Sequence, residues 1–317
     1  MKFSYYPGCT AHSTSAEYTL SYREVLSVLG VELEEIEDWN CCGAAAARNL
    51  NYMLSISLPA RNIAIAQEKG RPLVIPCAGC FRNLKRADQA LRSDPEVKKR
   101  VESLVGFKFT GGLELRALLD VVVTDVGLER IAERVRRPLR GLKIVSYYGC
   151  ALVRPPKITH LDDPENPQCL DKLMETLGAI PLDWSYKTEC CGADLTFTRA
   201  DIVKRIVGEI MAGAREVGAE AIVTPCGLCH FNLEVREPST TDSMPVFYFT
   251  ELMGLAFGSE KCSQWWRKHF INPLKLLEEK GLAVGARESK RGRYEYLKEK
   301  IYWKRMDPGR DCLDRRT

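Results

Sequence analysis

The chain has 317 residues, enough for about two domains of typical size, and 45% of them are hydrophobic, which excludes a collagen-like, low-complexity or wholly disordered protein. The net charge of +4 originates in residues 287–317, which hold 11 basic and 6 acidic residues, so the rest of the chain lacks the basic surface of a nucleic-acid-binding protein. No apolar stretch reaches the ~20 residues that span a bilayer, and the N-terminal residues lack a signal-peptide pattern, so we expect a cytoplasmic protein.

The predicted elements begin as an alternation of strand and helix. A β-rich run at Lys2–Tyr6 leads into Gly-Cys, and Thr14–Glu17 fits a capping box that opens a helix ending at Leu29-Gly30. The apolar run Leu73–Ile75 has the composition of a buried parallel strand, and a Cys-x-x-Cys sequence follows it directly. This order of elements predicts an α/β unit with a small, mainly parallel sheet flanked by helices.

The same order returns in the second half of the chain. Lys143–Tyr148 is again a β-rich run that ends in Gly-Cys, and Asp171–Gly178 corresponds to the first predicted helix. Ala221–Val223 is a second apolar strand followed by Cys-x-x-Cys. The pattern predicts two homologous domains, residues 1–137 and 138–258, and a C-terminal extension, residues 259–317.

Cysteine spacing is the strongest evidence for this repeat. In each copy a single cysteine precedes a Cys-Cys-Gly sequence, and the second of these adjacent cysteines lies 35 positions before a Cys-x-x-Cys pair. The second copy has eight extra residues, which fit best in the Pro-rich and Asp-rich loop 155–167. Ten of the 13 cysteines belong to the two copies: Cys9, Cys41, Cys42, Cys77 and Cys80, then Cys150, Cys190, Cys191, Cys226 and Cys229.

These cysteines favour metal chemistry over a disulfide framework, because a reducing cytosol keeps thiols reduced. Ligands of open α/β sheets bind at the carboxyl edge of the strands, so the three cysteine groups of each copy should converge there. Five thiolates exceed the four that close a zinc site, and adjacent cysteines reach different irons of a polynuclear cluster more easily than one small ion. Iron–sulfur ligation is our interpretation, with zinc binding, redox dithiols and buried structural cysteines as the alternatives.

The double motif resembles the CCG-domain family, and residues 7–13 and 38–43 resemble those of the B subunit of heterodisulfide reductase. The resemblance covers residues 1 to about 258. It implies that each CCG domain is α/β and binds a noncubane [4Fe-4S] cluster. Five cysteines would hold each of the two clusters: Cys9, Cys41, Cys42, Cys77 and Cys80 for the first, and Cys150, Cys190, Cys191, Cys226 and Cys229 for the second.

The resemblance also implies an activity and partners. A disulfide would be cleaved or formed between the two clusters in sequential one-electron steps, since an iron–sulfur centre normally passes one electron at a time. The electrons would come from the ferredoxin-like C subunit, linked to the flavin-bearing A subunit, because this chain has no ferredoxin motif and no dinucleotide-binding motif. His12 and His230 lie near cluster cysteines in sequence and are candidate proton donors, with a purely structural histidine as the alternative for each.

Two other functions fit the same residues. One is a noncatalytic CCG electron-transfer subunit of a lactate- or glycolate-oxidase-type complex, and the other is a zinc-stabilised interaction module. The extension also has two interpretations. With Trp265-Trp266, Trp303 and its basic excess it is a candidate docking segment for a partner, or residues 261–280 form a helix packed on the second domain with a solvated charge run beyond.

Overall fold

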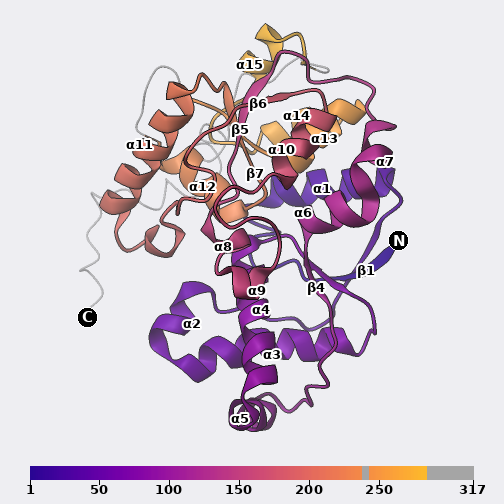
Figure 1. The fold of residues 1–317 in the computed structure, drawn as a ribbon, viewed down its shortest axis with the longest axis vertical. Helices are drawn as coiled ribbons and strands as arrows, with labels where there is room; N and C mark the ends of the chain where they lie inside the picture. Colours follow the sequence, from indigo (N-terminus) through magenta and orange to yellow (C-terminus); the bar gives the residue numbers. More distant parts are fainter. Residues whose placement is uncertain (238–242, 284–317) are drawn as a thin grey trace, which may run out of the picture.

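The protein contains two separate parallel sheets, one in each half of the chain (Figure 1). The computed structural model describes residues 1–237 and 243–283. The first sheet has the order β2-β1-β3-β4, with β1 Lys2–Tyr5, β2 Glu32–Glu35, β3 Leu73–Ile75 and β4 Leu115–Ala117. The second has the equivalent order β6-β5-β7-β8, with β5 Lys143–Ser146, β6 Ile180–Pro181, β7 Ala221–Thr224 and β8 Val246–Tyr248. All pairings are parallel, which confirms the predicted α/β class.

Helices follow the strands of the first half. Asn51 and Asp94 cap α3 and α5, because each side chain accepts a hydrogen bond from a backbone N–H of the first turn. The capping box predicted at Thr14–Glu17 is wrong: α1 begins after Ser15, whose side chain makes no capping hydrogen bond. The helices are α1 Ala16–Val28, α2 Ala44–Leu50, α3 Tyr52–Gln67, α4 Ala78–Ser93, α5 Pro95–Val105, α6 Leu118–Asp120, the π-helical segment Val121–Gly127 and α7 Leu128–Ala132.

The second half repeats this plan with shorter elements near its first cysteine. Part of the stretch 155–167, which we predicted as a loop, forms the short helix α9, since Pro156 sits in the first turn where it loses no hydrogen bond. The helices are α8 Cys150–Val153, α9 Pro156–Thr159, α10 Cys169–Thr176, the 3-10 turn Ala193–Leu195, α11 Ala200–Glu216, α12 Gly227–Arg236 and α13 Phe249–Phe257.

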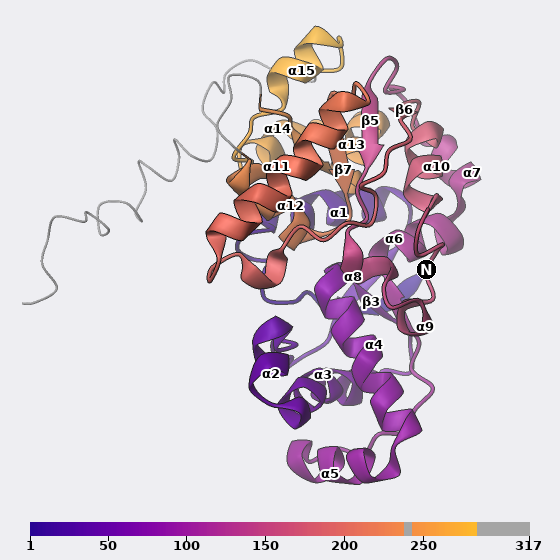
Figure 2. The same ribbon diagram turned by 60° about the vertical axis from the view of Figure 1, so that its left-hand side comes forward.

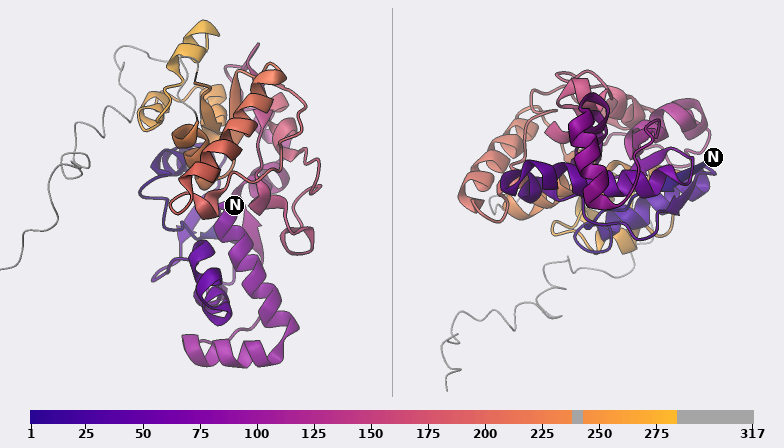
Figure 3. Two further views of the ribbon diagram at one scale, coloured as in Figure 1. Left: turned by 90° about the vertical axis from the view of Figure 1, so that its left-hand side faces the viewer. Right: turned by 90° about the horizontal axis from the view of Figure 1, so that it is seen from below.

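The two halves interlock through their helices. Helix α1 of the first half packs on α13 of the second, and α7 of the first half contacts α10 of the second. Tyr18 on α1 stacks on Tyr248 with ring centroids 4.3 Å apart, and the hydroxyls of Ser21 and Thr250 lie 2.6 Å apart. In Figures 2 and 3, α1 accordingly lies among the helices of the second half, while α2 to α5 form the opposite end of the molecule. The halves therefore share one continuous core.

The described part of the extension is folded against this core. It forms α14 Cys262–Trp266 and α15 Leu274–Glu279, and α14 contacts both α1 and α13. Trp265 and Trp266 are each 1% exposed, so the interpretation of these two indoles as a docking surface is wrong. The alternative of packing on the core is the one observed, although residues 261–280 form two short helices and not one. Trp303 and the basic excess lie outside the described residues. Within 1–237 and 243–283, no helix is both long and apolar enough to cross a bilayer.

The predicted domain boundaries fall between elements of the structure. The first, at residues 137 and 138, lies between α7 and β5, and the second, at 258 and 259, lies between α13 and α14. Because α1 packs on α13 and α7 contacts α10 of the opposite half, sequence repeats and packing units do not coincide, and the boundaries stay predictions.

Candidate metal centre

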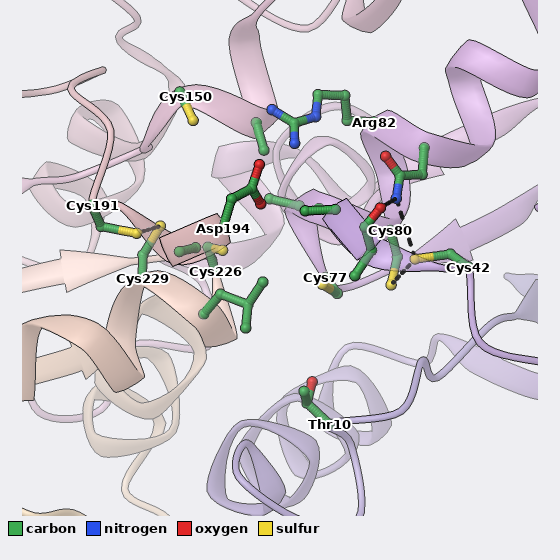
Figure 4. A pocket seen from close by; sticks show the side chains of 18 of the residues that line it. Thr10, Cys42, Cys77, Cys80, Arg82, Cys150, Cys191, Asp194, Cys226 and Cys229 are labelled. Atoms are coloured by element: carbon green, nitrogen blue, oxygen red, sulfur yellow. Dashed lines mark hydrogen bonds between the residues drawn. The ribbon is translucent and has the colours of Figure 1, made fainter. Parts of the chain in front are cut away.

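The cysteines are positioned by the carboxyl ends of the central strands. Strand β3 ends at Ile75 and β7 at Thr224, and in both copies the first cysteine of the Cys-x-x-Cys pair is the N-cap of the following helix. In open α/β sheets ligands bind at the carboxyl ends of the strands, and here the carboxyl ends of the two sheets face the same space between the halves. A cavity of ≈ 180 Å³ between the halves is lined by all ten repeat cysteines (Figure 4).

The sulfur atoms within each copy lie close together. In the first copy Cys42 Sγ lies 3.4 Å from Cys80 Sγ, and Cys41 Sγ lies 4.0 Å from Cys9 Sγ. The corresponding approach in the second copy is 3.6 Å between Cys191 Sγ and Cys229 Sγ. In both copies the Cys-x-x-Cys pair and the second adjacent cysteine are buried, whereas the first adjacent cysteine is exposed. The spacing repeat is therefore also a repeat in space.

The glycine of each Cys-Cys-Gly sequence has a backbone conformation that favours glycine. Gly43 has φ +85° and Gly192 has φ +75°, in the left-handed region that favours glycine. This turn directs the glycine N–H at the first sulfur of the pair, at 3.4 Å from Cys41 Sγ and 3.3 Å from Cys190 Sγ. A backbone N–H aimed at sulfur stabilises a thiolate, the form that binds metal.

Side chains of both copies hold the adjacent cysteines in the same way. The Tyr6 hydroxyl donates a hydrogen bond to the carbonyl of Asn40, just before Cys41, and the Tyr147 hydroxyl donates to the carbonyl of Glu189, just before Cys190. An asparagine one turn after each Cys-x-x-Cys pair adds a second support. Asn83 Nδ2 lies 3.5 Å from Cys42 Sγ, and Asn232 Nδ2 lies 3.7 Å from Cys191 Sγ and donates to the Cys191 carbonyl at 3.0 Å.

Neighbouring thiols shift one another's pKa. A hydrogen bond from Cys150 lowers the pKa of Cys190 to about 6, and a hydrogen bond from Cys80 lowers the pKa of Cys77 to about 7. The proton-donating partners are shifted the other way: the hydrogen bond to Cys190 is the largest cause that raises the pKa of Cys150. Each copy therefore presents thiolate sulfur near neutral pH, which makes it a ready ligand set for a soft cation.

The residues present fit iron–sulfur clusters. Each side of the cavity offers five sulfur donors, and none of the described residues that line it is a histidine, so the donor set is that of a thiolate-bound cluster. The glycine before the first cysteine keeps space open for sulfur. A Cβ added to Gly8 would lie 3.2 Å from Cys80 Sγ, and one added to Gly149 would lie 2.8 Å from Cys229 Sγ.

Sequence reasoning missed two charged residues of the cavity. Arg82 on α4 and Asp194 after the second Cys-Cys-Gly extend toward each other between the two cysteine groups, as Figure 4 shows. Asp194 also pairs with Arg48 of the other half at 2.7 Å. An alignment of the two copies would have indicated both residues. Arg82 is equivalent to Phe231 and Asp194 to Ala45, and the pattern of sulfur ligands does not explain these differences between the copies.

The two histidines predicted as proton donors do not line this cavity. His12 is exposed in the turn that follows Cys9. His230 is 2% exposed and stacks on Tyr248, with ring centroids 4.1 Å apart. Their role in proton transfer stays a prediction.

Comparison with known proteins agrees with the repeat. The family model of the cysteine-rich CCG domain matches residues 3–85 and 144–234, more than half of the chain. The chain is 29% identical over 269 residues to the B subunit of the ferredoxin/F420H2-dependent CoB-CoM heterodisulfide reductase of Methanosarcina acetivorans (81% of this chain, 89% of that protein), and 29% identical over 266 residues to the 8-methylmenaquinol:fumarate reductase membrane anchor subunit of Wolinella succinogenes (81% and 92%). It is 27% identical over 258 residues to the lactate utilization protein A of Bacillus pumilus (80% and 99%).

A solved structure shares the fold. The crystal structure of a hypothetical protein from Helicobacter pylori superimposes with a TM-score of 0.66 over 85% of this chain and 51% of that one, at 12% identity. With both copies matched and all ten cysteines gathered in one cavity, the chain belongs to the family of cysteine-rich CCG-domain proteins.

Proposed function

We propose that this protein is the catalytic iron–sulfur subunit of a heterodisulfide reductase-like complex. The observation that carries the proposal is the single cavity lined by the cysteines of both copies. Two centres that face one space suit a two-electron reaction of a disulfide, because each noncubane [4Fe-4S] cluster, when bound, supplies one electron at a time. The similarity to the B subunits of heterodisulfide reductases over 81% of the chain supports the same assignment.

The chain itself would bind and orient both the clusters and the substrate. Cys9, Cys41, Cys42, Cys77 and Cys80 would hold the first cluster, and Cys150, Cys190, Cys191, Cys226 and Cys229 the second. The cavity wall between them is largely apolar, since alanine, glycine and Leu228 line it with the sulfurs, and it would exclude water from the disulfide. Arg82 would add positive charge beside the second ligand set, where sulfur anions accumulate as the bond breaks.

Other proteins would deliver the electrons. We propose two partners, the ferredoxin-like C subunit with the flavin-bearing A subunit, on the ground that heterodisulfide reductases of two Methanosarcina species supply the similar B subunits. Trp265 and Trp266 do not form the docking surface for these partners, because both side chains are buried.

Metal content and reactivity test the proposal together. Anaerobically purified and reconstituted protein should contain about eight irons and about eight acid-labile sulfides per chain, the content of two four-iron clusters. Cys42→Ser should halve this content by removing the first cluster, while Cys262→Ser, which changes a buried cysteine outside the repeat, should leave it unchanged. A thiol- or disulfide-dependent paramagnetic signal should then appear in EPR spectra of the wild type. Zinc on the cysteines without iron or sulfide would instead identify a zinc module.

A noncatalytic electron-transfer subunit is the second candidate, favoured by the 27% identity to lactate utilization protein A over 99% of that protein. Both candidates require the clusters, so iron content does not separate them. EPR spectra that ignore every added thiol and disulfide, with clusters that still exchange electrons with a reductant, would support this second function and contradict the first.

A further inference from the structure

A second group of metal-ligating side chains lies away from the cysteine cavity. His230 and Glu234 lie one turn apart on α12, and His269 comes from the segment that follows α14. One ligand atom from each of the three lies within 4.8 Å of the other two. All three side chains are at most 2% exposed, so the group is built into the core and is not a surface cluster of charges.

The separations between these atoms suit ligands of one ion. His269 Nδ1 and Glu234 Oε1 lie 3.0 Å apart, yet their geometry makes no hydrogen bond, and neither atom has another such partner among the described residues. His230 Nδ1 lies 3.8 Å from Glu234 Oε2. Nitrogen and oxygen ligands of tetrahedral zinc at ~2.0–2.1 Å lie ~3.3 Å from each other, so the separation of His269 and Glu234 is close to what one shared ion requires. The separation of His230 and Glu234 is longer and involves the other carboxylate oxygen, which also accepts a hydrogen bond from the Phe270 N–H at 2.9 Å.

A second carboxylate orients the histidine for this purpose. His269 Nε2 lies 2.9 Å from Glu251 Oε1, and Glu251 Oε2 accepts a hydrogen bond from the Tyr248 N–H at 2.9 Å. A neutral imidazole that donates from Nε2 to a carboxylate has a lone pair on Nδ1, which is the atom that faces Glu234. Histidine ligands of metal ions usually have such a carboxylate or carbonyl behind them.

Charge balance also calls for a cation. Glu234 and Glu251 are both buried, and the ion pairs that the described residues offer them are with His230 and His269. Without an ion, protons on the two histidines are the alternative counter-charge. Glu234 and Glu251 carry two negative charges when both are ionised, and one divalent ion would balance both in an interior where unpaired charge is costly.

We propose that His230, Glu234 and His269 bind a zinc ion, with Glu251 as the residue that orients His269. Two imidazoles and one carboxylate are a known zinc ligand set, and the harder nitrogen and oxygen donors distinguish this site from the cavity of ten sulfurs. The ion would join α12, which carries Cys229 next to His230, to the chain after α14. The zinc site is thus structural, and it stabilises the position of α12 and of Cys229 in the second set of cysteines.

Zinc content and its coordination test the proposal on the full chain with its iron–sulfur centres loaded. Elemental analysis should give one zinc per chain, and zinc-edge X-ray absorption should show a nitrogen and oxygen shell near ~2.0 Å. A sulfur shell near ~2.3 Å would place the zinc on cysteines and overturn the proposal. Protein that contains no zinc after growth with zinc would also overturn it, and this result is expected if protons on the two histidines balance the charge. This wild-type measurement decides the question even if a variant does not fold.

Matched variants assign the ligands. Glu234→Gln and His269→Gln should each lose the zinc and keep the iron, whereas Glu237→Gln, a change of another mostly buried carboxylate at the end of α12, should keep both. Zinc retained in both folded ligand variants would refute the assignment. The zinc measurement is independent of the proposed function. If the protein does not react with disulfides but binds zinc through nitrogen and oxygen, the proposed function fails and this inference stands.

Discussion

Replacing Gly149 by alanine should remove the second cluster and leave the first. Gly149 precedes Cys150 with φ +65° and ψ 177°, a backbone region essentially restricted to glycine, so an alanine there costs about 1–3 kcal/mol of backbone strain. Its Cβ would also lie 2.8 Å from Cys229 Sγ, well short of the 3.4 Å at which ordinary contact begins. Cys229 lines the shared cavity and its sulfur lies 3.6 Å from Cys191 Sγ, so a sulfur displaced by the new Cβ would leave its position among the ligands.

Gly141→Ala is the matched control for the backbone. Gly141 has φ +78°, but a Cβ there would meet nothing within 4 Å, so this variant carries the strain without the contact to sulfur. Both variants place a Cβ on a residue with positive φ and should lose a few degrees of Tm, from on the order of 1–3 kcal/mol of strain. Iron per chain should fall by about half in Gly149→Ala alone, as measured after anaerobic reconstitution. Full iron content in Gly149→Ala, or an equal loss in Gly141→Ala, would refute the steric argument.

Two further variants test other parts of the structure. Gly254→Ala would place a Cβ 2.6 Å from ring carbons of Trp265 and should cost about 1–3 kcal/mol by overpacking, seen as a lower midpoint of denaturant unfolding; an unchanged midpoint would contradict the packing of α14 on α13. Arg82→Gln removes a positive charge that lowers the thiol pKa of Cys150 and Cys190, so the second cluster should become harder to reduce, by tens of millivolts in an EPR-monitored titration. Equal shifts in the reduction potentials of both clusters would show that Arg82 does not act on the second cluster in particular.

The sequence predicted the site well where covalent neighbours determine geometry. A cysteine directly after an apolar strand must lie at the carboxyl edge of the sheet, so the positions of Cys77 and Cys226 followed from Leu73–Ile75 and Ala221–Val223. The glycine after each adjacent pair was equally predictable, because few other residues adopt positive φ at Gly43 and Gly192.

Features that depend on contacts between distant segments were not predictable in this way. Trp265 and Trp266 are next to each other and near a basic run, which suggested exposure, but both indoles fill space beside α13 and α1. Arg82 follows Cys80 closely on α4, and although an alignment of the two copies singles it out, only the approach of the second half places it at the shared cavity. Thr14 fitted a capping pattern, yet the helix begins two residues later and uses no side-chain cap.

The helices α1 and α10 occupy equivalent places in the two copies, and each packs on the last helix of the opposite half, α13 and α7 respectively. Each half covers the first helix of the other, which is the arrangement left when the two protomers of a two-fold dimer are fused into one polypeptide. A lone half would leave an apolar helix face uncovered, so the fused copies assemble without depending on concentration. Within one polypeptide the two copies can differ in sequence, as Arg82 and the equivalent Phe231 do.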